Sequence, residues 1–142
     1  DAGYATALVG KWHLGYLPEQ SPTAHGFDYF FGLKSGFHDY YTHNAGDGKP
    51  DLWENESPIV EEGYMTDLIT QRAVSYIAQH TDAPFFLSLQ YNAAHWPYQP
   101  PGMPSEARMS PSRIARSGVQ SGRRSGVFDS HAARPIHRSA SV

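Results

Sequence analysis

The stretch TDLITQRAVSYIAQHTDAPFFLSLQY, residues 66–91, decides the fold class. In residues 66–80, apolar side chains recur at three- and four-residue steps, which predicts one amphipathic helix with Thr66 as its N-cap. After a short turn, residues 83–91 form an apolar run that predicts a buried strand. A helix that leads directly into an apolar strand is half of a βαβ unit. We therefore expect an α/β fold with a mainly parallel sheet.

The preceding sequence fits the same architecture. Residues 4–10 predict a short strand, and residues 27–33 predict an aromatic strand or a packed loop. Residues 34–62 are rich in Gly, Pro, Asn and Asp, so we expect them to be mostly loop. No internal repeat is present in the sequence.

Charged and imidazole side chains follow two of the predicted strands. Lys11 and His13 follow the strand at 4–10, and His95 follows the strand at 83–91. Ligands of parallel sheets gather at the carboxyl ends of strands. An ammonium group is a compact charge for a tetrahedral oxyanion, and a histidine donates or transfers a proton near neutral pH. The spacing alone is equally typical of a solvated strand end, so both interpretations stay open at this point.

The 142 residues are enough for one modest domain. The sequence contains no cysteine, which excludes disulfides, thiolate metal sites and a cysteine nucleophile within it. It has no apolar run of the roughly 18 residues that a membrane span needs, and no signal segment at its start. Because the sequence starts at Asp1 in mid-pattern, we expect it to be a piece of a longer chain.

The composition changes abruptly near residue 101. Residues 1–101 carry four Lys or Arg against twelve Asp or Glu, whereas residues 102–142 carry seven Arg against two acidic residues. We therefore divide the chain into a part able to form a core, 1–101, and an Arg/Ser-rich low-complexity tail, 102–142. The tail is a disordered linker, a nucleic-acid-binding arm or the product of an out-of-frame reading. The abruptness of the change favours the out-of-frame reading.

Two further segments contain residue types that can bind a metal ion. His38, Asp39 and His43 have a spacing compatible with a metal site, but we favour a polar surface loop. Asp47 and Asp51 lie in a Gly-rich loop that lacks the regular oxygen ligands of a calcium loop, so we interpret them as turn residues.

Four segments resemble one known family, in the same order. GYATALVGKWHLG, residues 3–15, closely resembles the second signature of the sulfatases. The later segments that resemble arylsulfatases, particularly the arylsulfatase B-like branch, are FDYFFGLKSGFHDYYTH (27–43), YMTDLITQRAVSYI (64–77) and PFFLSLQYNAAHWPYQPP (84–101). The resemblance implies part of an alkaline-phosphatase-like α/β core. It covers about residues 1–101.

The resemblance also implies roles for three residues. Lys11 corresponds to the lysine that contacts the sulfate, and His13 to the catalytic histidine beside the nucleophile. His95 corresponds to the histidine that both contacts the sulfate and helps to protonate the leaving oxygen. The family nucleophile is a formylglycine made from Cys or Ser in a C/S-x-P-S-R motif, next to a Ca²⁺ ion held by Asp and Asn residues.

Neither the nucleophile motif nor the family's metal ligands occur in this sequence. Residues 109–118, MSPSRIARSG, echo the motif, but Met109 stands where Cys or Ser is required. We therefore assign no metal ligand within this segment and expect the segment alone to be inactive.

The implied partner is a sulfated small molecule or a sulfated glycan, with no nucleic acid expected. The implied location is periplasmic, lysosomal or secreted, and the sequence itself does not determine it. Two alternatives stay open: an inactive truncated relative that binds anions or polyanions, and a phosphoesterase of the same superfamily.

Overall fold

The computed structural model describes residues 2–103, so nearly all of the predicted tail lies outside the described residues. The described part contains strands, two 3-10 helices and one α-helix. In chain order these are β1 (Ala5–Lys11), η1 (Pro18–Gln20), η2 (Pro22–His25), β2 (Tyr29–Leu33), β3 (Trp53–Glu54), β4 (Ser57–Pro58), α1 (Met65–Gln79) and β5 (Phe85–Gln90).

The strands form one open sheet with the order β4-β3-β2-β1-β5. The long strands β1, β2 and β5 are parallel, and β1 lies between the other two with Val9 opposite both Phe31 and Leu89. The short strands β3 and β4 form an antiparallel hairpin that extends the sheet beyond β2. The predicted α/β class and mainly parallel sheet are confirmed.

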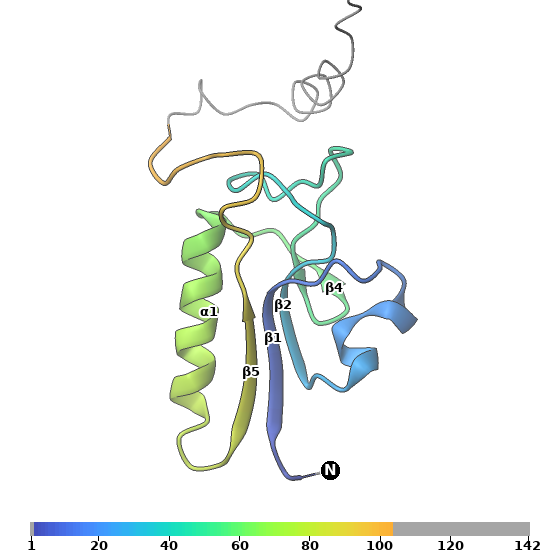
Figure 1. Ribbon diagram of the computed structural model, residues 1–142, viewed down its shortest axis with the longest axis vertical. Helices are drawn as coiled ribbons and strands as arrows, with labels where there is room; N and C mark the ends of the chain where they lie inside the picture. The colour runs from blue at the N-terminus through green and yellow to red at the C-terminus, as the bar shows by residue number, and fades with distance from the viewer. Residues whose placement is uncertain (1, 104–142) are drawn as a thin grey trace, which may run out of the picture.

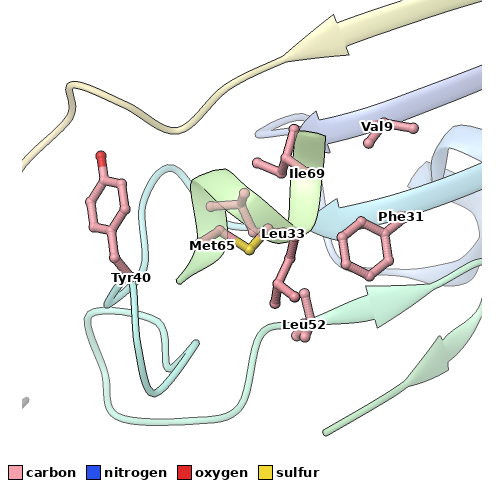
Figure 2. Close-up of a cluster of buried hydrophobic side chains, with 8 residues drawn as sticks. Val9, Phe31, Leu33, Tyr40, Leu52, Met65 and Ile69 are labelled. Carbon is pink, nitrogen blue, oxygen red and sulfur yellow. The ribbon is translucent and has the colours of Figure 1, made fainter. Parts of the chain in front are cut away.

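The helix α1 packs on one face of the sheet (Figure 1). Its buried side chains meet those of β1 and β2 in a core that also includes residues from the loops (Figure 2). The members of this core are Val9, Phe31, Leu33, Tyr40, Leu52, Met65, Leu68 and Ile69. Burial of one such side chain contributes about 1.5–3 kcal/mol, which makes this cluster the main link between helix and sheet.

Two local expectations are wrong. The N-cap of α1 is Tyr64, without a side-chain cap, and Thr66 lies inside the first turn with a buried hydroxyl that has no partner among residues 2–103. The Met65 amide instead donates to the Tyr40 carbonyl at 2.8 Å, so tertiary contact and not side-chain capping fixes where the helix begins.

The strand β5 is also less buried than its apolar sequence predicts. Phe86 is 55% exposed and Leu89 is 41% exposed. The reason is position, because β5 is the last strand of the sheet and α1 covers only one of its faces.

The loops that follow the three parallel strands lie toward the same end of the sheet (Figure 1). This is the end at which Lys11, His13 and His95 occur. Within residues 2–103, no helix has the length and apolar character needed to cross a membrane.

Candidate functional site

The end of β1 is shaped by a close approach of backbones. Gly10 has a φ of +122°, and a Cβ at this position would lie 1.8 Å from the carbonyl oxygen of Gln90 on β5. Gly32 on β2 has the same relation to the Gly10 carbonyl. Only glycine fits at these two positions, so the three strands converge immediately before the chain reaches Lys11.

Trp12 holds the segment that follows β1. Its amide donates to the Leu33 carbonyl at 2.9 Å, and its indole Nε1 donates to the Gln20 carbonyl at 2.7 Å. With Trp12 fixed, its two neighbours occupy defined places at the sheet end. Lys11 is half-buried, and none of the ion pairs found within residues 2–103 involves it.

His13 rests against the backbone after β2. Its φ of +61° is in the left-handed region, which is uncommon for a residue other than glycine. A Cβ on Gly36 would lie 2.6 Å from His13 Nε2, so the imidazole occupies the space that a side chain at position 36 would need. The glycine allows this approach, and the His13 ring stays solvent-exposed on its other side.

His95 is held by a hydrogen bond and by an aromatic stack. Its Nδ1 lies 2.7 Å from the Trp96 carbonyl oxygen. Because a carbonyl oxygen only accepts, Nδ1 carries a proton, and Nε2 is the nitrogen left for a ligand. The imidazole stacks on the Phe37 ring with centroids 5.4 Å apart and planes inclined by 5°.

The structure brings His13 and His95 to one cavity of about 520 Å³. Lys11 does not line this cavity, although it is the last residue of β1 and lies two residues before His13. The other lining residues come from the loops after β1 and β2: Tyr16, Ser35, Gly36, Phe37, Ala45, Gly46 and Asp47. Desolvation by neighbouring atoms and the nearby Asp51 raise the pKa of Tyr16, although 54% of the residue is exposed, and its hydroxyl is protonated and able to donate.

Sequence reasoning did not single out Tyr16, Ser35, Gly36 or Phe37. Nothing in their spacing marks them as site residues, because they become neighbours of the histidines only when β1, β2 and β5 align. Gly36 does follow the aromatic strand within three residues, which is the one local signal for a turn at the sheet end.

A second cavity, of about 430 Å³, lies between α1 and the sheet. Arg72 is the arginine that lines this cavity. Its guanidinium already pairs with Glu61 at 2.7 Å and lies 3.9 Å from Glu54. Asp28 also lines this cavity. The surplus of carboxylates disfavours an anion in this second cavity.

The interpretation of His38, Asp39 and His43 as a polar surface loop is wrong. All three side chains are buried. His38 Nδ1 donates to the Asp51 carbonyl at 3.3 Å, and His43 Nε2 donates to the Gly63 carbonyl at 3.1 Å. Burial lowers the pKa of His38 to about 3 and also lowers the pKa of His43, so both rings are neutral parts of the fold.

Asp51 is likewise more than a turn residue. Its carboxylate is buried and accepts the Lys34 and Ser35 amides and the Trp53 indole at 3.0–3.1 Å. Asp39 accepts the Tyr41 and Thr42 amides and the Gln99 amide group at 2.7–2.9 Å. These carboxylates hold together the loops after β2 and β5.

Among residues 2–103, no group of three or more His, Asp or Glu side chains has the arrangement of a metal site. The buried carboxylates of Asp39 and Asp51 are occupied by backbone and side-chain donors. The described residues therefore do not fit a Ca²⁺ site.

Residues 1–123 match the family model described as Sulfatase. The matched range extends past the composition change near residue 101, and the predicted boundary there stays a prediction. Arylsulfatase J of Mus musculus is 43% identical over 111 residues, which cover 72% of this chain and 19% of the relative. The N-acetylglucosamine-6-O-sulfatase of Bacteroides thetaiotaomicron is 38% identical over 104 residues, covering 70% of this chain and 16% of the relative.

Solved structures give the same result. Ps i-CgsB in complex with k-i-k-neocarrahexaose superposes with a TM-score of 0.60 at 32% identity, covering 68% of this chain and 25% of that chain. BT4656 in complex with its substrate D-glucosamine-2-N,6-O-disulfate superposes with a TM-score of 0.52 at 38% identity, covering 70% and 18%. This chain thus spans about a fifth of the length of the curated relatives it matches.

Proposed function

Because this chain belongs to the sulfatase family, we propose that Lys11, His13 and His95 form part of the sulfate site of a sulfate ester hydrolase. The observation that supports this most directly is that His13 and His95 line one cavity, although they are far apart in the sequence. The substrate class is a sulfated small molecule or glycan. Relatives described as aryl and amino-sugar sulfatases support this class.

Each side chain has a distinct task in this proposal. The Lys11 ammonium supplies a fixed positive charge to the sulfate oxygens. His13 stands beside the position of the attacking group, with Nε2 over Gly36. The His95 Nδ1–H donates a hydrogen bond to the Trp96 carbonyl, so Nε2 is the nitrogen that faces the sulfate. In the doubly protonated ring the Nε2–H contacts a sulfate oxygen and passes its proton to the leaving oxygen.

The reaction also needs a nucleophile. The resemblance implies a formylglycine, and this cysteine-free sequence has no motif from which one is made. A metal is implied by the family, but the described residues do not fit one. We therefore expect these 142 residues to bind sulfate weakly and to give no turnover by themselves.

A chimera tests the proposal. Residues 2–103 replace the matched residues of mouse arylsulfatase J, and kcat/KM is measured on an aryl sulfate and on the corresponding aryl phosphate. We expect sulfate to be preferred, and Lys11→Ala to lower kcat/KM on the order of 100- to 1,000-fold.

Glu62→Ala is the control, because Glu62 is an exposed charged residue that takes part in none of the ion pairs found within residues 2–103 and does not line the cavity. Its loss should change kcat/KM by no more than about threefold, since exposed charges are screened. A preference for phosphate would reverse the choice of substrate class. Full activity of Lys11→Ala would remove Lys11 from the site.

A further inference from the structure

We propose that Phe37 is a positioning residue that holds the His95 imidazole in the orientation used for sulfate, an inference that rests on the function proposed above. His95 is exposed, and its imidazole makes a single hydrogen bond within residues 2–103, to a carbonyl of its own neighbour. One such bond leaves the ring free to rotate about its Cα–Cβ and Cβ–Cγ bonds. The nearly parallel face of Phe37 restricts the planes that the ring can adopt, and the Nδ1 bond then fixes which edge of the ring faces the Trp96 carbonyl.

Phe37 is itself fixed from several directions. Ser35 Oγ donates to the Phe37 carbonyl at 2.6 Å, which holds the backbone. The Trp96 indole meets the Phe37 ring edge-on, with centroids 5.4 Å apart and planes inclined by 70°. The ring tip packs on Gly46, where an added Cβ would lie 2.6 Å from Cζ. A ring held at its backbone, its edge and its tip is a rigid support for the imidazole stacked on its face.

The residue next to Phe37 serves the other histidine. The missing side chain of Gly36 leaves the space that the His13 ring occupies, and the Phe37 ring stacks on the His95 ring. One dipeptide therefore sets the distance between two imidazoles that come from different strands. His38, which follows directly, is fully buried and anchors this dipeptide to the fold.

The proposal predicts a defined tautomer. With the ring held on Phe37, Nδ1 of His95 faces the Trp96 carbonyl and carries the proton of the neutral ring, while Nε2 faces the cavity and carries the second proton when the ring donates to a sulfate. If Phe37 no longer holds the ring, both ring orientations and both neutral tautomers become populated. The side-chain ¹⁵N shifts of His95 report this difference directly.

The experiment uses the whole 142-residue chain, labelled with ¹⁵N-histidine. Side-chain ¹⁵N shifts are recorded above pH 7.5 to read the tautomer, and at pH 6.0 without and with sodium sulfate at constant ionic strength to read binding, because only a protonated Nε2 donates to sulfate. For Phe37→Leu we expect averaged Nδ1 and Nε2 shifts in place of a single tautomer, and a sulfate dissociation constant raised about three- to tenfold. The matched control is Phe85→Leu, which removes a ring from beside His80, away from the cavity. It should leave His95 and its sulfate response unchanged.

Gly46→Ala is a second variant that keeps the ring. Its Cβ forces the tip of Phe37 to move, so it should shift the His95 signals in the same direction even if Phe37→Leu does not fold. A single Nδ1–H tautomer with unchanged sulfate affinity in the folded variants would overturn the proposal. If wild-type His95 has a single tautomer but sulfate shifts no signal, the proposed function fails while the positioning of the ring by Phe37 stands.

Discussion

The buried His38 makes the stability of this fold depend on pH in a direction that the structure determines. His38 is fully buried, and the groups that face it are His43, Asp39 and Asp51. Burial lowers its pKa to about 3, with the neighbouring His43 adding to the effect. An unfolded histidine has a pKa of about 6.5. Between these two values the unfolded chain binds a proton that the folded chain excludes.

The sign and the magnitude follow from this difference. Where only the unfolded state binds the proton, the free energy of unfolding falls by about 1.4 kcal/mol per pH unit as the pH decreases. From pH 7.5 to pH 5.0, His38 alone therefore removes about 2 kcal/mol. The pKa of His43 is lowered as well, which acts in the same direction. The pKa of Asp51 is raised by burial, which acts in the opposite direction and mainly at lower pH.

Urea titrations of the 142-residue chain, followed by tryptophan fluorescence at pH 7.5 and pH 5.0, measure this loss. In His38→Asn the side-chain amide can still donate to the Asp51 carbonyl but does not titrate. The variant will be less stable at both pH values because ring volume is lost, but its stability should depend on pH by about 2 kcal/mol less than that of the wild type. His25→Asn, which removes an exposed imidazole, is the control. An unchanged pH dependence in His38→Asn would refute the reasoning.

Two other substitutions test the packing that positions the site. Gly10→Ala should prevent cooperative folding or lower the urea midpoint strongly, because its Cβ would meet the Gln90 carbonyl at 1.8 Å; a midpoint equal to that of the wild type would contradict the convergence of strands described here. Ile69→Ala should cost about 2–5 kcal/mol of stability, since Ile69 is fully buried between α1 and the sheet. Val74→Ala, on the exposed side of the same helix, should cost less than about 1 kcal/mol of stability. Equal losses of stability in the two variants would contradict the finding that α1 packs on the sheet through its Ile69 side.

The main elements of the fold could be predicted from the sequence because each has a strong local pattern. The apolar stripe of α1 and the β-branched and aromatic runs of β1, β2 and β5 placed these elements within one or two residues. The helix start was missed because a tertiary hydrogen bond from Met65 to Tyr40 replaces a side-chain cap. The exposure of β5 was missed because a strand's own sequence does not say whether it lies at a sheet edge.

The candidate site could be predicted only in part. Lys11, His13 and His95 were singled out because they lie at strand ends and in segments that resemble a known family; the structure brings His13 and His95 to one cavity, and the roles of all three stay predictions. Phe37 and Gly36 were not found, since their importance depends on contacts across strands. The burial of His38, Asp39, His43 and Asp51 was missed for a related reason. Polar side chains in a loop suggest a surface, but here they supply the hydrogen bonds that a buried loop requires.

The most direct test of the central claim is a sulfate titration of the 142-residue chain, read at its individual histidine side chains. Chloride at equal ionic strength is the reference. The proposed site predicts saturable shifts of His13 and His95 with one common dissociation constant of about 1 mM or weaker, which corresponds to about 4 kcal/mol or less of binding free energy. The constant should rise in Lys11→Ala, while His25 and His80 should not respond. Sulfate shifts that are linear, or equal at all of these histidines, would contradict the account.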